Sequence, residues 1–147
     1  NDRNSDGTYN SNETEAFTAI NCLDYRNDAN VDHMRQQAAE LVAKAPVFGP
    51  IMSWGGTSCA TWPFPGIRDR AAIHADGSAP ILVVGTTNDP ATPYAWAVSL
   101  AKQLQNGHLI TRKGEGHTGY NKGNSCVDSA VDGFFIDGTV PASDPKC

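Results

Sequence analysis

One continuous apolar run stands out in the second half of the chain. Ile81–Val84 is apolar at every position and rich in β-branched residues, and Gly85 follows it. Such a run is typical of a strand that is buried on both faces of a parallel sheet. Leu109 and Ile110 predict a second, shorter strand.

Between these two strands the apolar positions follow the helical period over Tyr94–Gln105. Thr92 is suited to capping this helix, Pro93 to its first position, and Gly107 follows its end. Strand, helix and strand at this spacing predict one βαβ unit with parallel strands.

The first third of the chain also has helical periodicity. It predicts a helix over Thr14–Cys22 and a second helix that Asp32 caps and that runs to about Lys44. The segment Ile67–His74 has room for one or two further helical turns before the first strand.

A last helix is predicted after the second strand. Asn124 or Ser125 is suited to capping it, and its apolar face continues to about Ile136. Gly138 ends it.

Aromatic residues gather in a segment rich in glycine and proline. Pro50–Pro65 contains Trp54, Trp62 and Phe64. These side chains form either the wall of a pocket or a hydrophobic clamp under a loop that Cys59 holds. We favour the clamp, because aromatics of this size bury large area without regular structure.

Charge and composition exclude two classes of partner. The chain has 147 residues and a net charge of −5, from 11 basic and 16 acidic residues. The basic residues are scattered, which argues against nucleic acid as the main partner. No apolar run approaches the length of a membrane span. Because no signal-peptide pattern is present and the first residue is Asn, we expect that the chain begins after a cut.

The chain has four cysteines: Cys22, Cys59, Cys126 and Cys147. An even number fits an oxidising compartment, and four cysteines allow three connectivities. Pairing of nearest neighbours keeps each bridge inside one segment and pins the tail onto the last helix. No C-x-x-C pair is present, which argues against a zinc site.

Polar residues follow both predicted strands. Asp89 comes a few residues after the first strand, and His117 a few residues after the second. Adjacent parallel strands bring such loops to the same edge of the sheet, so a carboxylate and an imidazole can meet there. The carboxylate then takes the Nδ1 proton and leaves Nε2 free as a base.

Each of these two residues has a simpler interpretation. Asp before Pro often only satisfies the backbone of a turn, and a histidine between glycines can be a simple loop residue. Their matched positions at two strand ends favour the pair. A metal site made of Asp89, His117 and another histidine has no supporting H-E-x-x-H pattern, so neither metal nor cofactor is expected. His33, His74 and His108 lack the partner spacing of a site and are expected to be surface histidines or histidines satisfied by a local partner.

Two motifs carry a resemblance to a known family. V-V-G-T-T-N-D-P-A-T-P followed by G-E-G-H-T-G-Y resembles the last third of an α/β-hydrolase, and more narrowly the secreted tripeptidyl aminopeptidases and their TAP-like relatives. I-N-C-L-D and S-C-A-T-W-P are also similar to that family. The resemblance implies that Asp89 is the acid and His117 the base of a catalytic triad, in a secreted or cell-envelope extracellular protein.

The matching motifs contain no nucleophile. An α/β-hydrolase carries its serine in G-x-S-x-G, on a strand-to-helix turn before the acid and the histidine. Gly56–Ala60 reads G-T-S-C-A but follows no apolar strand, and Ser53 lacks the first glycine. We therefore expect the nucleophile and the oxyanion hole in a preceding segment that is missing from this chain.

The expected fold class is α/β, as the C-terminal portion of an α/β-hydrolase that is incomplete alone. Residues 1–66 are expected to be a remnant of the helical cap with an aromatic loop, and residues 67–147 the C-terminal part of the core. Two strands cannot cover their own faces and edges, so this part is expected to pack on a larger sheet.

The resemblance thus implies the C-terminal part of a secreted serine peptidase, similar to the tripeptidyl aminopeptidases, that releases short peptides. This part supplies the acid and the base of the triad and is expected to be inactive by itself. Two alternatives stay open. One is a non-catalytic binding or regulatory module of the same descent, and the other is part of a lipase or esterase.

Overall fold

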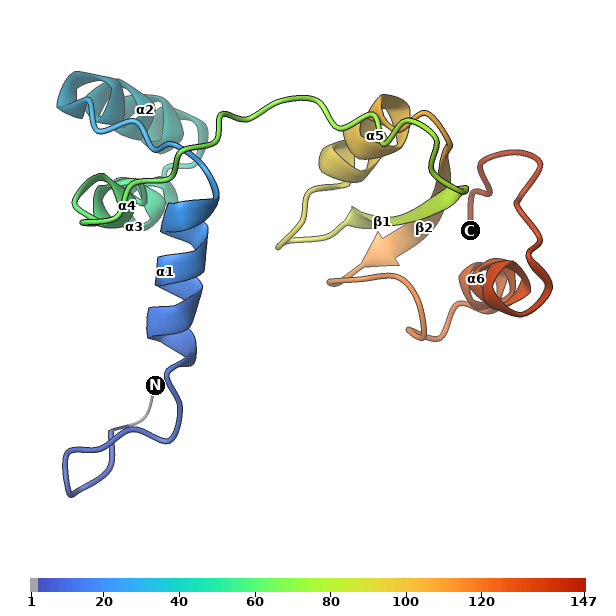
Figure 1. The fold of residues 1–147 in the computed structure, drawn as a ribbon, viewed down its shortest axis with the longest axis horizontal. Helices are drawn as coiled ribbons and strands as arrows, with labels where there is room; N and C mark the ends of the chain where they lie inside the picture. Colours follow the sequence, from blue (N-terminus) through green and yellow to red (C-terminus); the bar gives the residue numbers. More distant parts are fainter. Residues whose placement is uncertain (1–2) are drawn as a thin grey trace. The chain divides into compact units, whose positions relative to one another are not determined.

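A computed structural model describes residues 3–147 of the chain (Figure 1). The chain forms two compact units, one ending at Ala71 and the other covering Ala72–Cys147. The assignment of residues 1–66 to a cap and 67–147 to a hydrolase core stays a prediction.

The first unit is helical, as its periodicity predicts. It contains α1 (Glu13–Asp24), α2 (Val31–Lys44) and the short helices α3 (Gly49–Met52) and α4 (Thr57–Ala60). The disulfide Cys22–Cys59 joins α1 to α4.

Two local predictions for this unit are wrong. Asn30, and not Asp32, caps α2, because the Asn30 side chain accepts the backbone N–H groups of Asp32 and His33 at 2.9 and 3.1 Å. No helix forms over residues 67–74. Its first part is instead extended chain bound to Arg26: the Arg26 N–H donates to the carbonyl of Arg68 at 2.8 Å, and the Arg26 guanidinium pairs with Asp69.

The aromatic segment does not form the predicted clamp. The side chains of Trp54 and Phe64 are 44% and 65% exposed, and the segment includes α3 and α4 rather than irregular chain alone. Phe64 meets the ring of Trp62 edge to face, with the ring centroids 6.5 Å apart. Trp62 is partly buried, but Trp54 and Phe64 stay exposed, so the burial of all three rings that a clamp requires is not reached.

The second unit has the predicted order of strand, helix, strand and helix. Its elements are β1 (Ile81–Asn88), α5 (Tyr94–Gln103), β2 (Gly107–Glu115) and α6 (Ser125–Asp137). The strands are parallel, and their register runs from Ile81 opposite Gly107. The α/β fold class is therefore confirmed.

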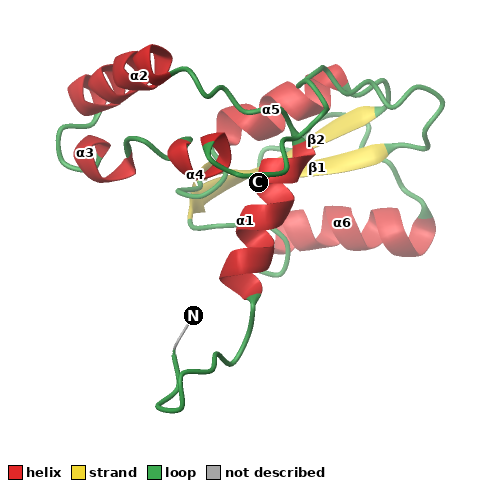
Figure 2. Ribbon diagram, turned by 60° about the vertical axis from the view of Figure 1, so that its left-hand side comes forward, coloured by secondary structure: helices red, strands yellow, loops and turns green. Residues whose placement is uncertain are grey.

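Helices cover both faces of this sheet (Figure 2). Successive strand residues point to opposite faces. Val83 and Leu109 thus pack on the side of α5, whereas Ile110 packs against Val127 and Val131 of α6. This placement on two faces explains the continuous apolar run, since every position of the strand meets a helix.

Local hydrogen bonds decide which residues cap α5 and α6. Asn124 caps α6 through bonds from the N–H groups of Cys126 and Val127, and Gly138 ends it with φ of 68°, as predicted. Thr92 does not cap α5. Its hydroxyl binds Asp89 instead, and Pro93 takes the cap position.

The C-terminal tail lies along β2 on the side away from β1. The Thr111 N–H donates to the carbonyl of Pro145 at 2.9 Å, and the Cys147 N–H donates to the carbonyl of Thr111 at 2.7 Å. The disulfide Cys126–Cys147 ties this tail to α6. The two bridges thus follow the nearest-neighbour pairing.

Candidate active site

Asp89 and His117 lie at the carboxyl ends of the two strands. Asp89 directly follows β1, and His117 follows β2 by two residues. The Nδ1 atom of His117 is 2.9 Å from Oδ2 of Asp89 and 3.1 Å from Oδ1. The meeting that the two strand ends predict is therefore present.

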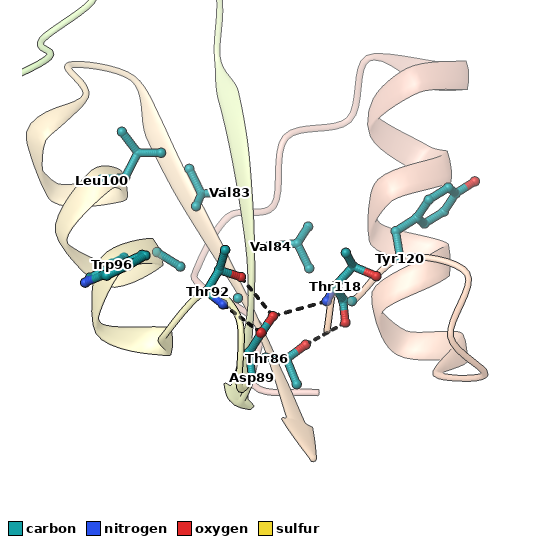
Figure 3. A pocket seen from close by; sticks show the side chains of 12 residues that line it. Val83, Val84, Thr86, Asp89, Thr92, Trp96, Leu100, Thr118 and Tyr120 are labelled. Atoms are coloured by element: carbon teal, nitrogen blue, oxygen red, sulfur yellow. Dashed lines mark hydrogen bonds between the residues drawn. The ribbon is translucent and has the colours of Figure 1, made fainter. Parts of the chain in front are cut away.

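The Asp89 carboxylate is buried and accepts hydrogen bonds, among them those from Thr92 and Thr118 that Figure 3 shows. Its side chain is 3% exposed. Oδ1 accepts the N–H groups of Ala91 and Thr92, each at 2.8 Å, and Oδ2 accepts the Thr92 hydroxyl at 2.9 Å and the Thr118 N–H at 3.1 Å. Asp89 thus satisfies the backbone of its own turn and also faces the imidazole, so the two interpretations are compatible.

These contacts decide the charge of Asp89. Burial by itself raises the pKa of a carboxyl group, but here hydrogen bonds from Thr92, His117 and Ala91 outweigh it and hold the pKa of Asp89 well below its usual range. Asp89 is therefore ionised at neutral pH and can accept a hydrogen bond from the Nδ1–H of His117.

His117 is oriented by its carboxylate partner but is open to the outside. Its side chain is 52% exposed. With Nδ1 directed at Asp89, the tautomer that this bond favours carries its proton on Nδ1. The lone pair on Nε2 is then available to a proton donor that approaches the exposed side of the ring.

The loop that carries His117 has an unusual backbone. Gly116 has φ of 97°, and Thr118 has φ of 68°, a value that residues other than glycine seldom adopt. Two bonds hold Thr118 in this conformation: its N–H donates to Asp89, and its carbonyl accepts the hydroxyl of Thr86 at 2.9 Å. Figure 3 shows both bonds.

Sequence reasoning missed three threonines of this site. The sequence pattern predicts a helix cap at Thr92 and assigns no role to Thr86 or Thr118. A signal existed for two of them. Thr86 is a polar residue continuing a buried strand, and Thr92 stands three positions after Asp89, where the carboxylate of an Asp turn receives backbone and hydroxyl donors.

The remaining histidines lie elsewhere. His33 is a surface histidine with a partner, in line with the expectation: its Nδ1 is 2.8 Å from Oδ2 of Asp28, and both side chains are more than half exposed. His74 contacts the carbonyl of Gln103 through Nδ1 at 3.0 Å. Within residues 3–147 no group of three or more His, Cys, Asp or Glu side chains is arranged to hold a metal ion.

A hollow of about 570 Å³ lies beside β1. The strand residues Val83 and Val84, Trp96 and Leu100 of α5, and Tyr120 line it together with Asp89 (Figure 3). Within residues 3–147 no strand pairs with β1 on the side away from β2.

Among the helices of residues 3–147, none combines the length and the apolar character that a membrane span requires.

This parallel βαβ unit, with helices on both faces, is part of an α/β-hydrolase fold. Residues 45–147 match the family described as TAP-like protein. The chain belongs to this TAP-like family of α/β-hydrolases.

Similar proteins in bacteria agree with this assignment. The chain is 40% identical over 153 residues to the serine protease Hip1 of Mycobacterium tuberculosis. This match covers 99% of the chain and 28% of Hip1. It is 39% identical over 154 residues to carboxylesterase B of the same species, with the same coverage. It is 29% identical over 137 residues to the tripeptidyl aminopeptidase of Streptomyces lividans, covering 92% of the chain and 26% of that protein.

The chain thus spans little more than a quarter of the length of these relatives, and it corresponds to their C-terminal region.

Proposed function

We propose that this chain supplies the acid and the base of a Ser-His-Asp triad in a secreted serine peptidase. The observation that carries the proposal is the contact between His117 Nδ1 and the buried, ionised Asp89. A carboxylate that is anchored by backbone N–H groups and faces a half-exposed imidazole is the arrangement that a triad base requires.

The chemistry follows from the two nitrogens of His117. Nε2 removes the proton of a serine hydroxyl as its oxygen attacks the scissile carbonyl, and the imidazolium then protonates the leaving amine. A water molecule repeats the sequence to release the acyl group. Asp89 holds the ring in the required tautomer and stabilises the imidazolium without taking the proton, in keeping with its low pKa.

The nucleophile belongs, in this proposal, to a segment outside the chain. Ser58 lies in the four-residue helix α4, and Ser53 directly follows α3 and donates its hydroxyl to the carbonyl of Gly49. Neither follows a strand, so neither stands on the strand-to-helix turn of a hydrolase nucleophile. The greater length of the relatives leaves room for a serine-bearing segment.

The free side of β1 supports a packing partner for this unit. Its edge presents backbone groups without a neighbouring strand among residues 3–147, beside the apolar hollow described above. Trp96 is 63% exposed there. We infer that the rest of the same hydrolase adds a strand at this edge, since exposed apolar edges otherwise pair with other chains.

Peptides are the proposed substrates, because relatives are named serine protease and tripeptidyl aminopeptidase. The similarity to carboxylesterase B favours ester hydrolysis as the second candidate, and the same pair of residues serves both reactions. The two disulfides fit an extracellular location.

A serine-directed fluorophosphonate probe tests the triad. We expect this chain to stay unlabelled and the longer protein that carries it to be labelled, with the His117→Ala variant of that protein losing the label. Labelling of Ser53 or Ser58 contradicts the proposal. A longer protein that takes no label at all would show a binding or regulatory module instead. Turnover of peptide anilides against p-nitrophenyl esters then separates peptidase from esterase.

A further inference from the structure

The end of β1 binds the loop that carries His117. The regular pairing of the strands is disturbed between Thr86 and Asn88, where a register shift occurs. Side chains replace the ladder there. The Thr87 hydroxyl donates to the carbonyl of Gly114 at 3.2 Å and accepts its N–H at 3.0 Å, and the Thr86 hydroxyl donates to the carbonyl of Thr118 at 2.9 Å. Two neighbouring threonines thus hold both ends of the histidine loop.

Thr86 is the more telling of the two. Its side chain is 2% exposed, although it is polar and stands in a strand whose other buried positions are apolar or glycine. Because the hydroxyl is removed from water, it needs a protein partner, and the Thr118 carbonyl provides it. A purely structural position in this strand would be filled as well by valine, which has the same shape without the hydroxyl.

The bond from Thr86 acts next to the imidazole. It holds the carbonyl of Thr118, whose N–H donates to the same Asp89 oxygen that faces His117 Nδ1. Thr118 is thereby fixed in a left-handed conformation, and the ring of the preceding residue is directed at the carboxylate. Without the Thr86 hydroxyl, the strained conformation loses one of its two supports.

We propose that Thr86 is a positioning residue for His117, a role that rests on the proposed triad. Thr86 contacts neither Asp89 nor His117 through a hydrogen bond of its own and acts through Thr118. Its hydroxyl keeps the histidine loop in the geometry from which Nε2 can reach a nucleophile. Small displacements of a catalytic group cost rate rather than substrate affinity.

The test compares variants of Thr86 with a variant of a second buried threonine. Thr86→Val removes the hydroxyl and keeps the shape, and Thr86→Ser keeps the hydroxyl. Thr111→Val is the matched control: Thr111 is 3% exposed on the neighbouring strand, and its hydroxyl is bonded to the Tyr94 hydroxyl and to Lys146, away from the histidine loop. If the Thr86→Val protein does not fold, Thr86→Ala takes its place, because it also removes the hydroxyl.

Two readouts are measured. In the chain itself, we expect Thr86→Val to speed hydrogen exchange of the Thr118 N–H about tenfold, because the loop loses the hydrogen bond from Thr86 to the Thr118 carbonyl. We also expect the ring ¹⁵N signals of His117 to shift toward the mixture of tautomers seen in free histidine. In the longer enzyme, we expect kcat to fall about tenfold with KM unchanged. Thr86→Ser should restore both readouts, and Thr111→Val should change neither.

Two results would overturn this role for Thr86: an unchanged Thr118 exchange rate and kcat in Thr86→Val, or an equal change in Thr111→Val. The His117→Ala variant separates this failure from that of the triad. If His117→Ala stays active, the proposed function itself is wrong. If it is inactive while Thr86→Val behaves as the unmodified protein, only the positioning role is lost.

Discussion

Asp89 and His117 are 28 positions apart in the chain, and the Asp89 Oδ2 atom lies 2.9 Å from the His117 Nδ1 atom. Asp28 and His33 show nearly the same distance, 2.8 Å, in the other unit. The two pairs differ in their surroundings. Both members of the second pair are exposed, whereas Asp89 is buried and receives four further donors from its own turn and from Thr118. The distance between acid and imidazole is therefore nearly the same in the two pairs, and it is the burial and anchoring of the acid that set Asp89 and His117 apart.

The first prediction concerns the charge of that acid. Asp89→Asn places an amide N–H₂ opposite Nδ1 and favours the wrong tautomer of His117, with the proton on Nε2. We expect kcat of the longer enzyme to fall about 10⁴-fold, the usual cost of losing the triad acid. Steady-state kinetics on a peptide anilide measures it, with Asp28→Asn as the control that keeps kcat. A decrease smaller than tenfold would remove Asp89 from the mechanism.

The second prediction concerns acid stability. The pKa of Asp89 in the folded chain lies below its usual value of 3.8. As pH falls below about 4, the unfolded chain therefore takes up this proton before the folded chain does, and folding is disfavoured. The stabilisation that ionised Asp89 contributes is complete above that pH and is lost as the pH falls through the pKa of Asp89 in the folded chain.

Urea unfolding between pH 2 and 6, followed by NMR signals of β2, measures this loss. The free energy of unfolding should decrease steadily toward pH 2 in the natural chain and should vary less in Asp89→Asn. Equal slopes for the two proteins would show that Asp89 is not the group that titrates.

The third prediction concerns the core beneath the site. Ile110 is fully buried between the sheet and α6, whereas Ile136 at the end of the same helix is 79% exposed. Ile110→Ala should lower the free energy of unfolding by about 2–5 kcal/mol through lost burial and a cavity. Ile136→Ala should change it by less than about 0.5 kcal/mol. Denaturant titration of both variants compares them, and similar values would mean that α6 is not packed on β2.

The fourth prediction concerns the second disulfide. Replacing Cys126 and Cys147 together by alanine opens a loop of 21 residues, so we expect a loss of about 3 kcal/mol. The tail should then leave β2, and the Thr111 N–H, which is bonded to Pro145, should exchange faster. The double variant Cys22→Ala and Cys59→Ala is the control, because its bridge lies in the other unit. A protected Thr111 N–H in the first variant would show that the tail binds without its bridge.

The sequence predicted those features that rest on strong, local signals. The apolar run Ile81–Val84, the helical period after it and the position of His117 in a glycine-rich loop were enough for the βαβ unit and for the contact between acid and base. Both strands are longer than predicted, because polar residues such as Thr86 and Arg112 continue the pairing beyond the apolar positions.

The errors arose where two polar residues compete for one role. Asn30 and Asp32 are both good caps, and only the observed path of the chain shows which side chain reaches the free N–H groups. Thr92 is likewise a good cap by type, but a buried carboxylate nearby is a stronger acceptor for its hydroxyl. The exposure of Trp54 and Phe64 was not predicted either, because aromatic content alone does not show what covers a ring.

The tail that runs beside Thr111 makes the two edges of the small sheet unequal, because it covers part of the edge of β2. Its bonds to Thr111 occupy the outer edge of β2, whereas within residues 3–147 the outer edge of β1 is left open to a further strand. In a sheet enlarged next to β1, Asp89 and His117 would follow the last two strands. The serine of the proposed triad, carried by a strand added there, would therefore lie on the Asp89 side of the pair, with His117 farthest from it across the sheet.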